Sequence, residues 1–179
     1  HRGFKRQRHA VLFAICFLFS GMSFCIGHIP ELSIKDNYLK AKELYEKERY
    51  AHAKKSFSKI IDYYVTNGDV QNKETIILCK YYIAKSSYLL KDKNAAFHIN
   101  SFLSEYPDHN LSDQLKFLKG KLFFEKKKFK QAIFQFSQVK EDLLTNNEII
   151  ELNFKKGYSY FYKKDFTNAE TSFEIIKDI

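Results

Sequence analysis

Few side chains in this sequence combine the type and the spacing that catalysis or metal binding requires. His52, His98 and His109 stand far apart, and no cysteine lies at a spacing from them that suits zinc. Gly157 opens a Gly-Tyr-Ser-Tyr segment that starts like a nucleophile elbow but lacks its second glycine. The chain also has no glycine-rich phosphate loop. The sequence therefore predicts a protein that is not an enzyme and that binds no metal or cofactor.

One recurring group of aromatic and lysine residues does suggest a binding chemistry. Four times along the chain, an aromatic residue lies three positions before a small residue and another lies four positions after it. The residue that follows the small one is lysine in three cases and tyrosine in the fourth. The groups are Tyr38, Lys42 and Tyr45; Tyr81, Lys85 and Tyr88; Phe117, Lys121 and Phe124; Phe154, Tyr158 and Phe161. Separations of four and seven residues place each group on one stripe of a helix.

Two interpretations of this stripe stay open. Aromatic stripes on helices more often fill a core than line a binding surface. In the other interpretation, the four stripes line a groove in which lysines alternate with rings. Such a groove would suit an extended or helical peptide that carries acidic and apolar side chains. A lysine between two aromatic residues favours the groove, because an ammonium group stays hydrated at a surface.

The elements that must position these stripes are repeated helix pairs. In each, the small residue is followed after 11 or 12 positions by an alanine, giving the pairs Ala41 and Ala53; Ala84 and Ala95; Gly120 and Ala132; Gly157 and Ala169. Small residues at these positions let two antiparallel helices approach closely, and each pair leaves an apolar face for the next pair to cover. The pattern predicts about four pairs, over residues 34–66, 74–108, 112–144 and 148–179.

The two glycines give this packing hypothesis a specific form. We expect Gly120 and Gly157 to lie on helices that pack closely against their partners. A leucine at Gly157 should overpack the helix pair, whereas an alanine there should be tolerated, because alanine is the better helix former.

This set of residues resembles the tetratricopeptide repeat. The shared features are a small residue on the first helix, an alanine on the second, an aromatic residue four positions later and a closing proline, Pro107. The chain departs from the family at Lys40, Lys119 and Lys156, where a large apolar residue usually precedes the small one. The resemblance implies an all-α fold, an α-solenoid of antiparallel helix pairs wound into a superhelix. It also implies that the first helices line a concave groove for a protein or peptide.

The leader at residues 1–26 has the layout of a secretory signal peptide. Four basic residues precede an almost wholly apolar run, Val11 to Ile26, which is short for a membrane span of about 20 residues. Gly21 and Ser23 supply small residues for cleavage. A signal peptide followed by these repeats is similar to the start of large exported bacterial tetratricopeptide-repeat proteins. We therefore expect export to the periplasm or to the outer membrane, and an array that continues past residue 179.

Alternatives to this localisation and function follow from the same leader and from the charge. Residues 10–26 could instead remain as an inner-membrane anchor, or Cys25 could carry a lipid. The net charge is +9, and the four basic residues of the leader account for four of these charges. Elsewhere lysines alternate with acidic residues, as on solvated helix faces. We expect a scaffold for a protein or peptide partner, and a basic α-solenoid that binds nucleic acid or another polyanion is the alternative.

Overall fold

The computed structural model of the protein describes residues 31–68, 72–177 and 179, so the predicted signal peptide or anchor at residues 1–26 lies outside them. Residues 35–179 form one compact unit. The described residues form eight α-helices and one short 3-10 helix, with no strand among them. The all-α class predicted from the sequence is therefore confirmed.

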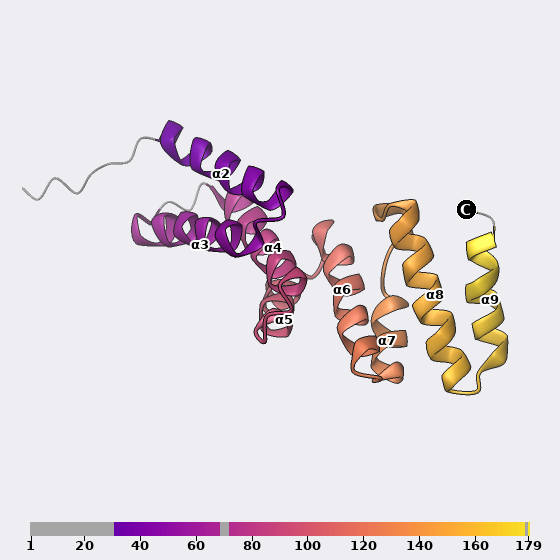
Figure 1. Cartoon of the computed structure of the whole chain (residues 1–179). Coiled ribbons are helices and arrows are strands. Elements are labelled where there is room, and N and C mark those ends of the chain that lie inside the picture. The colour runs from indigo at the N-terminus through magenta and orange to yellow at the C-terminus, as the bar shows by residue number, and fades with distance from the viewer. Residues whose placement is uncertain (1–30, 69–71, 178) are drawn as a thin grey trace, which may run out of the picture. The chain divides into compact units, whose positions relative to one another are not determined.

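The helices follow one another through short connections (Figure 1). They are α2 (Glu31–Glu46), α3 (Tyr50–Thr66), α4 (Lys73–Leu89), α5 (Ala95–Glu105), α6 (Leu111–Glu125), α7 (Phe129–Phe136), the 3-10 helix η1 (Glu141–Leu143), α8 (Asn146–Tyr162) and α9 (Phe166–Lys177). From α3 onward each α-helix contacts the next one. In addition α4 contacts α6, and α6 contacts α8. In the part of the chain described, no helix has the length and apolar character needed to cross a membrane.

Four turns, after α2, α4, α6 and α8, share one backbone geometry. Each contains a residue in the left-handed conformation seven positions after the small residue: Glu48 (φ 58°), Lys91 (φ 52°), Lys127 (φ 55°) and Lys164 (φ 63°). In the third turn, the Lys127 and Lys128 amides donate to the carbonyls of Phe124 and Phe123, each at 2.8 Å. The other three turns have the same two hydrogen bonds. They satisfy carbonyl groups that the end of a helix leaves without partners.

Other helix boundaries have local causes that can be read from single residues. Helix α5 ends at Glu105, and Tyr106 then adopts φ −133°, since the residue before Pro107 is driven out of the helical region. Helix α8 starts with a capping box, in which the Thr145 hydroxyl accepts from the Glu148 amide and the Glu148 carboxylate accepts from the Thr145 amide.

The core consists of clusters formed between successive helices. One contains Tyr81, Ala84, Ile99, Phe102, Leu115 and Leu118; the next contains Phe117, Ala132, Phe136 and Leu152. Helix α6 contributes to both clusters, through Leu115 and Leu118 on one side and Phe117 on the other. All eight small residues of the repeat pattern are buried: Ala41, Ala53, Ala84, Ala95, Gly120, Ala132, Gly157 and Ala169.

Buried polar groups fasten the connection between α7 and α8. The Asp113 carboxylate accepts a hydrogen bond from the Lys140 amide at 3.1 Å and lies 3.3 Å from the Lys116 ammonium. The Asn153 amide donates to the Glu141 carboxylate at 3.2 Å. Because α7 is only 8 residues long, these contacts hold the chain that leads from it to α8.

Candidate partner-binding surface

The structure places the twelve residues of the predicted groove in three different environments. Tyr81 and Phe117 are buried in the core clusters. A second set is half-buried: Tyr38, Lys42, Tyr45, Lys85, Tyr88, Lys121 and Phe124. A third set is exposed: Phe154, Tyr158 and Phe161. Core filling therefore describes Tyr81 and Phe117, while the other ten retain access to solvent.

The Lys85 ammonium of α4 lies between two rings. Its Nζ is 5.4 Å from the ring centroid of Tyr81 on the same helix and 5.9 Å from that of Tyr45 on α2. These distances are within the range of cation–π attraction. The lysine thus joins two of the first helices of successive repeats.

Lys121 of α6 repeats this arrangement one step along the chain. Its Nζ lies 5.1 Å from the ring centroid of Phe117 on its own helix and 5.4 Å from that of Tyr88 on α4. In the next step Tyr158 of α8 takes the place of the lysine, and its ring lies 5.6 Å from that of Phe124 on α6. The residue that follows the small one therefore always meets the last aromatic residue of the previous stripe.

We call this series of contacts the ladder. Its members are Tyr45, Lys85, Tyr88, Lys121, Phe124 and Tyr158. It runs across α2, α4, α6 and α8, and its contacts link stripes that lie 36 or more positions apart in the sequence.

The two lysines of the ladder differ in their charge partners. Lys121 lies 2.8 Å from the Glu151 carboxylate of α8, which also lies 3.6 Å from Lys155. Lys85 has no carboxylate at ion-pair distance among the residues that the structure describes. Burial lowers the pKa of Lys85, and the charge of Glu148 opposes this shift only in part. Lys85 is therefore a half-buried ammonium group held between rings without an anion.

The tyrosines of the ladder remain protonated well above neutral pH. Burial, supported by neighbouring tyrosines and by Glu148, raises the pKa of Tyr45. Burial and the nearby Glu125 carboxylate also raise the pKa of Tyr88, whose hydroxyl donates to Glu125 at 3.0 Å. At neutral pH the rings therefore present neutral hydroxyl groups beside the lysines.

Glu151 and Glu125 are functional candidates that the stripe pattern does not include. Both hold ladder residues in place, Glu151 through Lys121 and Glu125 through Tyr88. Glu151 stands four positions before Lys155 on α8, which is a spacing for an ion pair on one helix face. That spacing indicates the pair with Lys155 but gives no sign of the contact with Lys121 on another helix.

The three histidines of the described chain lie apart. His52 is exposed on α3 and His98 is half-buried on α5. His109 accepts a hydrogen bond from the Leu111 amide at 3.2 Å, just before α6 begins. Within the described residues, no three histidine, cysteine or acidic side chains come close enough to hold a metal ion.

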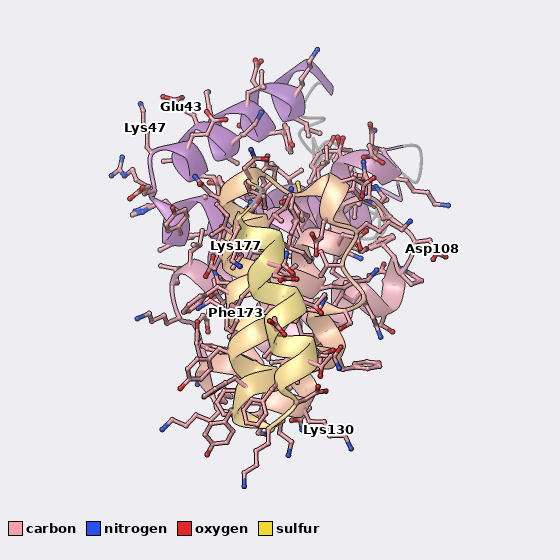
Figure 2. The ribbon with its side chains drawn as sticks, turned by 90° about the vertical axis from the view of Figure 1, so that its right-hand side faces the viewer. Glu43, Lys47, Asp108, Lys130, Phe173 and Lys177 are labelled. Carbon is pink, nitrogen blue, oxygen red and sulfur yellow. The ribbon has the colours of Figure 1, made fainter. Side chains whose placement is uncertain are left out.

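A second apolar surface lies on α8 and α9. Phe161 and Phe166 are 56% and 60% exposed, and a hollow of about 370 Å³ opens beside them and Phe173. Figure 2 looks onto α9 and shows Phe173 and Lys177 on that helix. Glu170 and Glu174 also line this hollow, so the apolar surface has charged edges.

Comparisons of the chain with protein-family models, with curated proteins and with solved structures found no significant match. The contacts and charges of the described residues are therefore the basis for a functional proposal.

Proposed function

We propose that this protein is a scaffold of the tetratricopeptide-repeat type that binds a protein or peptide partner along the ladder. In this proposal the fold is an α-solenoid of antiparallel helix pairs. Two ring contacts between α8 and α9 support an antiparallel pair: Phe154 lies 6.2 Å from Phe173, and Phe161, later in α8, lies 5.6 Å from Phe166, earlier in α9. The repeated turn geometry supports equivalent hairpins along the chain.

Lys85 is the observation that carries the binding proposal. A protein that needed only a packed core would gain nothing from an ammonium group held between two rings, since partial desolvation of a charge costs free energy. A partner carboxylate would give this ammonium the anion that it lacks among the described residues. Apolar groups of the partner would contact the half-buried rings of Tyr45 and Tyr88. The partner is thus an acidic and apolar segment of another protein.

Selection of peptides from a displayed random library on the immobilised protein tests this proposal. We expect the selected peptides to be rich in acidic and apolar residues. Lys85→Ala should then weaken the best peptide about tenfold at low salt, the loss of one charge-assisted contact, and less at high salt. Lys130→Ala, which removes an exposed lysine on α7 outside the ladder, is the matched control. Equal affinity of the two variants would place binding elsewhere.

We also propose that the protein is exported to the bacterial cell envelope, on the basis of the basic and apolar leader at residues 1–26. N-terminal sequencing of the mature protein tests this. A chain that begins near Phe24 and is found in the envelope fraction would support export. A cytoplasmic product that still carries residues 2–26 would contradict it.

A further inference from the structure

The turn between α6 and α7 is followed by an aromatic residue that fills the space beside it. Phe129 comes two positions after the left-handed Lys127 and is only 6% exposed. Its ring centroid lies 5.8 Å from that of Phe124, 6.0 Å from Tyr158 and 4.4 Å from Tyr162. Phe129 therefore occupies a socket formed by its own hairpin and by the next first helix, α8.

Two of the other three turns have an aromatic residue at the same position. Tyr50 follows the left-handed Glu48 by two residues and lies 5.3 Å from Tyr45. Phe166 follows Lys164 by two residues and lies 5.6 Å from Phe161.

The turn between α4 and α5 lacks this ring. Lys93 stands two positions after the left-handed Lys91, and α5 does not begin until Ala95. The sequence gap between Ala84 and Ala95 is one residue shorter than in the other repeats, which displaces the start of the helix. No aromatic side chain is therefore available at the place that Phe129 takes in the next repeat.

A hollow of about 410 Å³ lies at this place. Its apolar wall includes Tyr88, Ala95, Ala96 and Leu122. Tyr88 is the equivalent of Phe124, because each lies four positions after its small residue, and Glu125 on the rim is likewise the equivalent of Tyr162. The hollow is thus the socket of the second repeat without its ring, and its volume is in the range of ligand sites.

The rim of the hollow is basic. Lys91, Lys93 and Lys126 line it with exposed side chains, and none of them forms an ion pair within the described part of the chain. The two rim carboxylates already have partners: Asp92 is bound by Lys54, and Glu125 accepts from the Tyr88 hydroxyl at 3.0 Å. Three free ammonium groups around an apolar hollow complement an aromatic group that stands between carboxylates.

We propose that this hollow is a second binding site, which takes one aromatic side chain from an acidic segment of a partner protein. The ring enters where Phe129 enters in the next repeat, and the flanking carboxylates face Lys91, Lys93 and Lys126. This site touches the ladder only through Tyr88, so it can bind even if the ladder does not.

Fluorine NMR with a defined peptide tests this site on the whole chain. The probe is a short peptide with one fluorinated phenylalanine between glutamates, and the comparison peptide carries lysines in their place. We expect the glutamate peptide to bind the wild type and the lysine peptide not to bind. Lys93→Phe should supply the missing ring, raise the melting temperature and weaken the glutamate peptide at least about tenfold, consistent with displacement of a buried ring.

Two further variants keep the test decisive. Lys130→Phe adds an exposed ring on α7 away from the hollow, and it should leave both binding and melting temperature unchanged. Lys126→Glu reverses one rim charge without filling the hollow, and it should weaken the glutamate peptide. Lys85→Ala should have no effect, which separates this site from the ladder. Absence of binding to the wild type, equal binding of both peptides, or unchanged binding by Lys93→Phe would each overturn the proposal.

Discussion

Gly120 and Gly157 lie under the aromatic rings of the helices that they contact. A Cβ atom at Gly120 would lie 2.5 Å from Cδ1 of Phe136 and closer still to its Cε1. At Gly157 the corresponding distances to Phe173 are 3.0 Å and 2.8 Å. The expectation that alanine is tolerated at such a site considered helix propensity only, and it left out the ring on the partner helix.

Alanine at these two glycines should therefore have unequal effects. Phe136 is 1% exposed and cannot move, whereas Phe173 is half-buried beside an open hollow and can swing outward. We expect Gly120→Ala to cost about 1–2 kcal/mol of stability, as overpacking outweighs the gain in helix propensity. Gly157→Ala should be close to neutral. Urea denaturation measures both, and equal losses at the two sites would contradict the role of the rings.

Cys79 is a fully buried thiol whose reactivity should report on folding. Burial raises its pKa to about 12, so almost no thiolate exists at neutral pH. We expect iodoacetamide to leave Cys79 unmodified in the folded protein and to alkylate it in urea. Peptide mapping by mass spectrometry distinguishes it from Cys16 and Cys25. Rapid alkylation of Cys79 without denaturant would show that α4 opens readily.

At the scale of elements, the four left-handed turns are the feature that sequence patterns could not reveal. The polar segments Lys126 to Lys128 and Lys163 to Asp165 do indicate where a helix pair must turn. However, left-handed helix ends are usually recognised by glycine, and these positions hold glutamate or lysine. Their conformation follows from the packing of the two helices that they join, which is tertiary information.

Glycine at one of these turns should stabilise the protein. Lys127 has φ 55°, a conformation that is unfavourable for a residue with a Cβ atom. We expect Lys127→Gly to raise the free energy of unfolding by about 0.5–1 kcal/mol. Lys126→Gly is the control, because φ of Lys126 is −84° and glycine brings no relief there. A gain from both substitutions, or from neither, would argue against conformational strain at Lys127.

The stripe pattern predicted which residues share a helix face, but the sequence could not predict their partners. Periodicity placed Lys85 beside Tyr81, four positions away on one helix. The contact with Tyr45 depends on how α4 packs against α2, and that of Lys121 with Glu151 on how α6 packs against α8. The hollow beside Tyr88 has a weak signal in the sequence, namely a linker one residue short that lacks an aromatic residue.

For the whole molecule, the buried tyrosines make alkaline pH the condition under which stability is lost. Burial and neighbouring groups raise the pKa of Tyr38 to about 12, and burial also raises those of Tyr45, Tyr81 and Tyr88. Above about pH 10 the unfolded chain releases these protons while the folded chain retains them, so stability falls as pH rises. Lys85 acts in the opposite sense, because its pKa is lowered on folding, but it is one group against four.

We expect the urea midpoint to decrease continuously between about pH 10 and pH 12, with tyrosinate absorbance that appears together with unfolding. Tyr38→Phe should reduce the slope, since it removes one of the groups that release a proton on unfolding. A midpoint that is constant over this range would show that the tyrosines are ionised in the folded protein.

Helix α6 forms part of two core clusters, and this sets how the protein comes apart. If each hairpin had a core of its own, the chain could unfold one repeat at a time. Leu115 and Leu118 close the cluster with α4 and α5, while Phe117 closes the cluster with α7 and α8. Loss of α6 therefore exposes both clusters at once, and the two neighbouring hairpins become one cooperative unit. Amide hydrogens in α4 and α8, on opposite sides of α6, would then exchange with solvent at similar rates, because a single opening event exposes them both.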